Sequence, residues 1–167
     1  MVSMDYRERS YRYLFWRKLF ISLIAIGLVY ILFIRPIQSF TVREFILPAF
    51  DSLITPDSEI LSSPGVDEFF LESITNSFPR VKIEVPFNGY FWLAMAMIWP
   101  AKNRRFGRFI LIYNWILFLI IPIVAISIIN GFSWLAPLAN VHDKVYKALF
   151  LILGVLAVRG ADELLKN

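Results

Sequence analysis

The chain of 167 residues is strongly apolar, with 58% hydrophobic residues and a formal net charge of +4, and its mean hydropathy is +0.63. A soluble domain of this length rarely needs so much apolar surface, whereas a chain embedded in a bilayer exposes apolar residues outside as well as inside. The absence of cysteine and the single histidine, His142, exclude a thiol nucleophile, a disulfide framework and a multi-histidine metal site within the chain.

Residues 1–18 mix basic and aromatic side chains, a composition typical of a helix at the membrane–water interface. Residues 19–34 are an apolar run of 16 residues, and the aromatic residues before it extend it toward the length of about 20 that a crossing needs. Arg35 and Pro36 close the run. A cleaved signal peptide is the alternative, but no small-residue cleavage site follows. We therefore predict a basic cytoplasmic lead-in and an uncleaved first transmembrane helix.

The next segment, residues 35–87, carries more acidic than basic side chains and is predicted to lie outside the cytoplasm. Thr41 and Glu44 have the spacing of a capping box, which predicts a helix start with an apolar face on the membrane surface or on a partner. A second short helix is expected over residues 67–77. Residues 81–85 then alternate apolar and charged side chains, which predicts a short strand.

One strand alone is not stable in water, and the chain offers little for this strand to pair with. Its exposed edge predicts a docking site for a second protein. The alternative is an extended strut that leads into the next span. Gly154, Ala157 and Ala161 make a small-residue helix face that also allows close contact with a partner. The residues predicted to dock a partner are Val81, Ile83, Val85, Gly154, Ala157 and Ala161.

Three more transmembrane helices are predicted after residue 87. Residues 88–101 are uncharged and have aromatic residues at both ends. They should cross, because the basic segments 1–18 and 102–108 both belong in the cytoplasm. Residues 109–130 are an uncharged run of 22 residues. The predicted order is lead-in 1–18, first span 19–34, outer segment 35–87, second span 88–101, basic cytoplasmic turn 102–108, third span 109–130, outer loop 131–143, fourth span 144–159 and cytoplasmic tail 160–167.

The basic residues beside the apolar runs predict topology rather than nucleic-acid binding, because positive charge next to a span favours the cytoplasmic side. In the fourth span, Lys144 and Lys147 are expected to extend outward to the headgroups. We predict a multi-pass membrane protein with both termini in the cytoplasm and the lipid bilayer as its first partner. The topology and headgroup residues are Arg17, Lys18, Lys102, Arg104, Arg105 and Arg108.

No catalytic, cofactor-binding or metal-binding residues are predicted. His142 and Asp143 form a single adjacent pair, expected to be solvated or to cap a helix in an outer loop. The chain has no glycine-rich phosphate loop and no nucleophile elbow, and its paired carboxylates are sequence neighbours, which point apart on a helix. We expect a protein that is not an enzyme, with no evident small-molecule substrate.

The stretch from Pro86 to Leu93, the basic turn after it and Tyr113 in a long aliphatic helix resemble small membrane proteins associated with bacterial exosortases, which are multi-span enzymes that process surface proteins. The resemblance implies a location in the bacterial inner (plasma) membrane. It implies an accessory role only, since the exosortase itself uses a cysteine that this chain lacks. It assigns no functional residue.

The predicted fold is an all-α membrane protein with about four transmembrane helices and a small mixed outer segment between helices 1 and 2. The predicted function is a non-catalytic accessory subunit of an inner-membrane assembly that docks a larger multi-span protein, in an exosortase-type sorting or export system. The alternative is an oligomeric channel or transporter subunit with Asn114, the Pro122 kink and Asn130 along its pathway. A third hypothesis is an enzyme that uses Arg35 and outer carboxylates on lipid-linked substrates.

Overall fold

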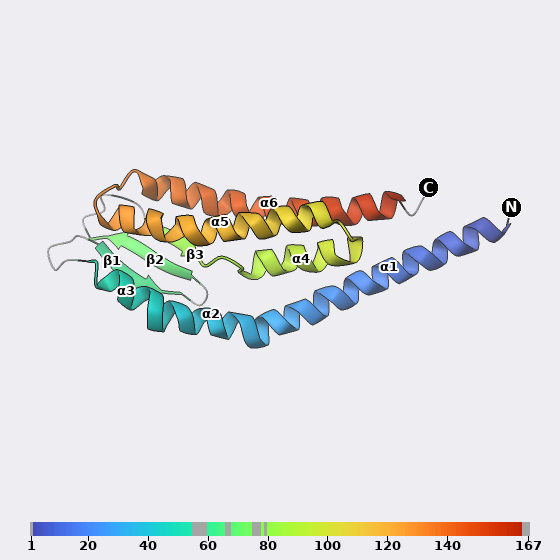
Figure 1. Ribbon diagram of the computed structural model, residues 1–167, viewed down its shortest axis with the longest axis horizontal. Coiled ribbons are helices and arrows are strands. Elements are labelled where there is room, and N and C mark those ends of the chain that lie inside the picture. The colour runs from blue at the N-terminus through green and yellow to red at the C-terminus, as the bar shows by residue number, and fades with distance from the viewer. Residues whose placement is uncertain (1, 55–59, 66–67, 75–77, 79, 165–167) are drawn as a thin grey trace.

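The computed structural model describes residues 2–54, 60–65, 68–74, 78 and 80–164. Over these residues the chain is mostly helical, with a three-stranded antiparallel sheet at one end (Figure 1). It has four helices, because the segments labelled α1, α2 and α3 form one continuous helix. The elements are α1 Val2–Val29, α2 Arg35–Thr41, α3 Leu47–Asp51, β1 Ile60–Pro64, β2 Glu68–Ser73, β3 Val81–Glu84, α4 Gly89–Ala101, α5 Arg104–Ile129 and α6 Leu135–Leu164.

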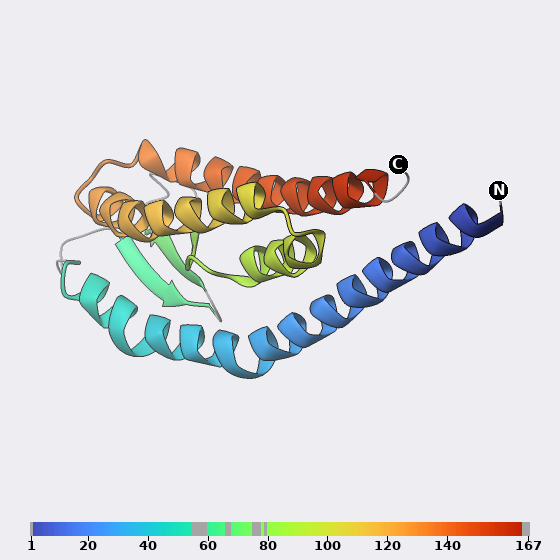
Figure 2. The same ribbon diagram turned by 45° about the vertical axis from the view of Figure 1, so that its right-hand side comes forward.

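The first helix is continuous through α1, α2 and α3, with two π-helical turns between them at Tyr30–Ile34 and Val42–Ile46. Each π turn ends two residues before a proline, Pro36 or Pro48. Proline has no N–H to donate and its ring crowds the carbonyl four residues earlier, so the helix widens at these points. The helix bends near the first π turn and curves around the sheet (Figures 1 and 2).

One prediction for this helix is wrong. Arg35 and Pro36 end the apolar run, but the residues that follow them stay helical. Thr41 caps no new helix, since it lies inside the continuous one and its hydroxyl donates a 2.9 Å hydrogen bond to the Ile37 carbonyl.

The sheet has the order β1-β2-β3, so the strand predicted at residues 81–85 has a neighbour within the chain. The helix predicted over residues 67–77 is wrong, because Glu68–Ser73 is the central strand β2. Its buried side chains, Phe69 and Leu71, alternate with more exposed ones, and Phe69 stacks on Phe50 of α3 with ring centroids 5.2 Å apart. The predicted all-α fold is therefore a mostly helical fold with a small sheet.

The free edge of β3 is covered by a side chain of α6. Asn140 accepts a hydrogen bond from the Lys82 N–H at 3.3 Å and donates one to the Arg80 carbonyl at 3.1 Å. Its amide thus replaces part of a fourth strand, so this edge is partly bonded within the chain, and docking of a second protein there stays a prediction.

Helix α4 has 13 residues and packs between α1 and α6. The small-residue face of α6 makes this close approach possible. A Cβ atom added at Gly154 would lie 2.9 Å from Met97 Sδ and 3.6 Å from Ala94 Cα, both on α4. This small-residue face of α6 therefore packs against α4 of the same chain.

The backbone between β3 and α4 is irregular but well bonded. Phe87 has a positive φ of 62°. Its N–H donates to Asn114 Oδ1 at 2.9 Å, and Gln38 Nε2 donates to the carbonyls of Pro86 and Phe87 at 3.2 and 3.0 Å. Side chains of the first helix and of α5 therefore satisfy the backbone groups of this irregular segment.

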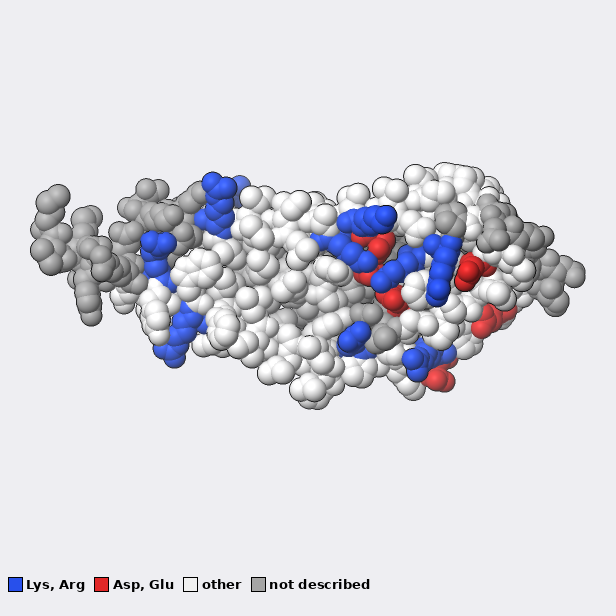
Figure 3. All heavy atoms as spheres, turned by 180° about the vertical axis from the view of Figure 1, so that it is seen from behind, with Lys and Arg blue, Asp and Glu red and all other residues white. Residues whose placement is uncertain are grey.

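Two helices are long and apolar enough to cross a membrane: Ser10–Asp51, which runs along the first helix, and α5. Seen from behind, basic side chains gather toward one end, an uncharged band follows, and mixed acidic and basic side chains cover part of the other end (Figure 3). The start of α1, the α4–α5 turn and the end of α6 lie toward the same end of the molecule (Figure 1).

Candidate functional site

A row of alternating charges joins the sheet to α6. Lys82 Nζ pairs with Glu68 and lies 3.2 Å from Glu84 Oε1. Lys147 Nζ lies 2.7 Å from the same Glu84 oxygen and 2.8 Å from Asp143 Oδ2. We call these five residues the charged row. Because each lysine contacts two carboxylates, mutual attraction offsets the cost of removing the charges from water.

The charged row also changes the pKa of Lys82, the lysine on β3. Burial lowers the pKa of Lys82, but its hydrogen bonds to Glu68 and Glu84 and the charges of these carboxylates outweigh burial. The net effect is a pKa above the ordinary value of lysine. Lys82 is therefore a fixed cation at neutral pH rather than a proton donor.

Buried amides extend the charged row toward α5. Asn88 Nδ2 donates to Glu84 Oε2 at 2.5 Å, while Asn88 Oδ1 caps α4 by accepting from the N–H groups of Tyr90 and Phe91. The Tyr146 hydroxyl lies 3.2 Å from the side-chain oxygens of both Asn88 and Asn114. These contacts hold β3, α4, α5 and α6 in one arrangement.

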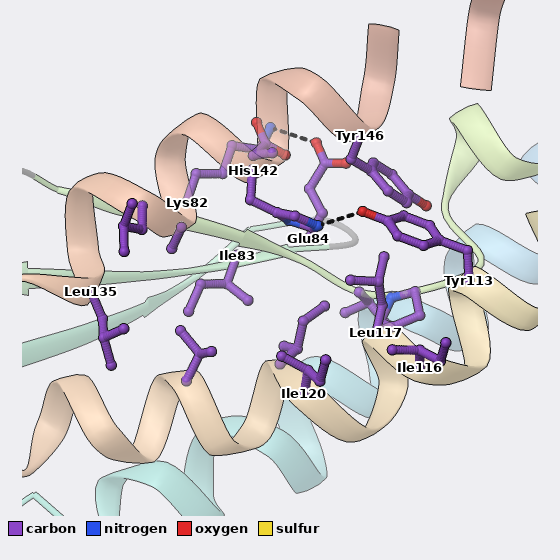
Figure 4. Close-up of a pocket in the computed structure, with 17 residues that line it drawn as sticks. Lys82, Ile83, Glu84, Tyr113, Ile116, Leu117, Ile120, Leu135, His142 and Tyr146 are labelled. Atoms are coloured by element: carbon purple, nitrogen blue, oxygen red, sulfur yellow. Dashed lines mark hydrogen bonds and ion pairs between the residues drawn. The ribbon is translucent and has the colours of Figure 1, made fainter. Parts of the chain in front are cut away.

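Beside this polar group lies an apolar cavity of about 370 Å³ between β3, α5 and α6. Its walls are mostly aliphatic side chains, including Leu117 and Ile120 of α5 and Leu135 of α6 (Figure 4). The volume is within the range of small-molecule sites, and mostly apolar walls with few polar groups are typical of such sites.

One end of the cavity is polar. Tyr113 Oη lies 2.9 Å from His142 Nε2, and the Lys82–Glu84 pair lies beside them (Figure 4). The cavity therefore offers apolar contact along its length and hydrogen-bonding groups at one end. That combination suits an amphiphile. Among the described residues no group of three histidine, cysteine or acidic side chains could hold a metal ion.

A second hollow of about 390 Å³ shares Lys82 and Glu84 with the cavity but is otherwise lined by different residues. We call it the charged pocket. Its lining residues are Tyr30, Arg35, Glu68, Lys82, Glu84, Asn88, Gly89, Tyr90 and Lys147.

The residues predicted to dock a partner mostly pack inside the chain. Val81 and Ile83 are buried in the core between the sheet and the helices, and Val85 is half-buried against that core. Gly154 and Ala157 face α4, with Ala157 buried, and Ala161 is half-buried. The six residues predicted to set topology are all exposed, on α1 and around the α4–α5 turn.

Two predictions about polar residues are corrected by the structure. Lys147 points inward to the charged row rather than outward, whereas Lys144 is exposed. His142 and Asp143 belong to α6, because this helix begins at Leu135 and residues 135–143 are not a loop. Asn114 is fully buried and donates to the Ile110 carbonyl at 2.9 Å, and its place along a pathway of an oligomeric channel stays a prediction.

Sequence reasoning missed the cavity and the charged row, because both join residues far apart in the chain. The one local signal was the i,i+4 spacing of Asp143 and Lys147, which favours a pair on a helix. Comparison with known proteins finds no matching protein family, curated protein or solved structure.

Proposed function

We propose that this chain is a bacterial inner-membrane protein with four crossings and both termini in the cytoplasm. The support is the gathering of basic residues toward one end, which the positive-inside rule places in the cytoplasm. Helix α4 is short for a crossing, at roughly 20 Å. The irregular backbone at residues 85–88 completes its path.

Within this topology, the chain binds the apolar part of an amphiphile in the cavity between β3, α5 and α6. The observation that carries this proposal is an apolar cavity of about 370 Å³ with a hydrogen-bonding end. The α5 residues that line it, from Tyr113 to Val124, lie in the middle of α5 and toward its end farther from the basic turn. A single acyl chain is the most abundant ligand of that shape in a membrane.

Filling the cavity tests this function. Ile120→Trp places an indole in the cavity, and we expect loss of binding of a fluorescent fatty acid to the purified protein. Ile123→Trp, one turn along α5, is the matched control, because Ile123 is 63% exposed and does not line the cavity. Equal binding by both variants would show that the cavity is not the site.

A second proposal is the accessory subunit of a larger membrane assembly, in an exosortase-type system. It is supported by the first helix, in which the most apolar window of Ser10–Asp51 has no buried residues. Such a helix contacts either lipid or a partner helix. Gentle extraction and mass spectrometry of co-purifying chains separates the two, since only a partner appears in stoichiometric amount.

A further inference from the structure

The polar end of the apolar cavity carries more negative than positive charge. With His142 neutral, the charged side chains that line the cavity are Lys82, Glu84 and Asp143. The charged row, to which these three belong, has two lysines and three carboxylates. Arg35 lines the charged pocket and not the cavity. A carboxylate head group in the cavity would therefore meet an excess of negative charge, and like charges repel.

The ions of the charged row are also paired with one another. Lys82 contacts Glu68 and Glu84, and Lys147 contacts Glu84 and Asp143. An anionic head group would compete with the carboxylates for Lys82, and a cationic one would compete with the lysines for Glu84 and Asp143. Breaking a partly buried ion pair is costly. The charged row therefore favours neither kind of charged head group in the cavity.

The uncharged groups at this end, Tyr113 and His142, keep hydrogen-bonding capacity that faces the cavity (Figure 4). Their 2.9 Å hydrogen bond has two forms, which differ in the nitrogen that carries the imidazole proton. When the Tyr113 hydroxyl donates to His142 Nε2, its oxygen can still accept a hydrogen bond. When Nε2–H donates to the hydroxyl oxygen, the O–H of Tyr113 is left to donate. Tyr113 can thus offer an acceptor or a donor.

A hydroxyl group on a ligand matches both forms of this pair, because a hydroxyl donates and accepts. A carboxylate only accepts and an ammonium only donates, so each of them matches one form alone. The charge at the polar end and the hydrogen-bonding capacity of Tyr113 therefore favour the same head group, one that is uncharged and carries a hydroxyl.

We propose, on the basis of the function proposed for the cavity, that its ligand is a single-chain lipid with an uncharged hydroxyl head, which is the chemistry of a long-chain alcohol or a monoacylglycerol. The chain lies along the aliphatic walls, and the hydroxyl bonds to Tyr113 Oη. A fatty acid fills the same walls with its chain but binds less tightly, because its carboxylate meets the charged row.

The test compares ligands that share one saturated chain and differ in head group: an alcohol, a monoacylglycerol, a carboxylate and a trimethylammonium. Each is titrated at about pH 8, where histidine is mostly neutral, against the fluorescent fatty acid bound to the purified full-length protein. We expect the alcohol and the monoacylglycerol to displace the probe at lower concentration than the two charged ligands. The tighter of the two identifies the source of the hydroxyl.

Tyr113→Phe removes the hydroxyl and keeps the ring. We expect it to weaken binding of the hydroxyl ligands about three- to tenfold, the effect of one neutral hydrogen bond, and to leave the trimethylammonium unchanged. Tyr13→Phe is the matched control, because Tyr13 is exposed on α1 and does not line the cavity. The order of affinities in the wild-type protein tests the proposal without any variant.

Three results would overturn the head-group assignment while the cavity remains the site. They are tighter binding of the carboxylate than of the hydroxyl ligands, tighter binding of the trimethylammonium, and full affinity for the hydroxyl ligands in Tyr113→Phe. Failure of the probe to bind the wild-type protein, or its equal binding by Ile120→Trp, would instead remove the function proposed for the cavity.

Discussion

Replacing Asn114 by leucine is expected to destabilise the protein by about 1–3 kcal/mol, because the Phe87 N–H loses its partner and the Tyr146 hydroxyl keeps only Asn88 of its two. The Phe87 N–H and the Tyr146 hydroxyl both have Asn114 Oδ1 within 3.2 Å, and the side chain is fully buried. Leucine has a similar volume, so the loss is chemical rather than steric. The measurement is the free energy of unfolding in mild detergent, with denaturant as the variable.

The matched control is Asn130→Leu at the end of the same helix. Asn130 is exposed, and its amide donates to the Ile126 carbonyl within its own helix. Its replacement should change stability by no more than about 0.5 kcal/mol. Equal effects of the two substitutions would mean that the Asn114 contacts do not hold the irregular backbone at Phe87.

The second large effect is expected for Lys147→Leu, at about 2–4 kcal/mol of lost stability. Lys147 is the cation between Glu84 and Asp143, and its side chain is only 20% exposed. Without it, the two carboxylates keep part of their charge in a poorly hydrated place, which costs more than the ion pairs contribute. Thermal unfolding of the purified variant in detergent measures the loss.

Lys144→Leu, one turn earlier on α6, removes an exposed lysine and should be nearly neutral. The double variant Asp143→Leu with Lys147→Leu should lose less stability than the sum of the two single losses, because the carboxylate no longer lacks its partner. Strict additivity would contradict the pairing of these two residues across the charged row.

Periodicity and apolar runs predict the helices of this chain better than its sheet. The start of α4 is readable because Asn88, a strong N-cap residue, precedes an uncharged run, and Asn103 similarly precedes α5. Strand β2 was missed because two adjacent phenylalanines, Phe69 and Phe70, obscure the alternation of its buried side chains. Its strand character depends on pairing with β1 and β3.

The continuation of the first helix through Pro36 could not be predicted from local rules, which place a helix end there. The π turn before the proline absorbs the crowding, and packing of α2 and α3 around the sheet compensates for the weaker hydrogen bonding. The inward direction of the Lys147 side chain could not be predicted from the sequence either. Its partner Glu84 is far away in sequence, and the chain alone does not show that β3 lies beside α6.

The central claim is that the cavity between β3, α5 and α6 holds an acyl chain. The direct measurement is photolabelling of the protein in its membrane with a diazirine fatty acid, followed by mapping of the labelled residues. The account predicts labels concentrated on cavity-lining residues such as Leu117, Ile121 and Ala139. Labels confined to outward-facing residues such as Leu119 and Ile123, which are exposed on α5, would contradict it.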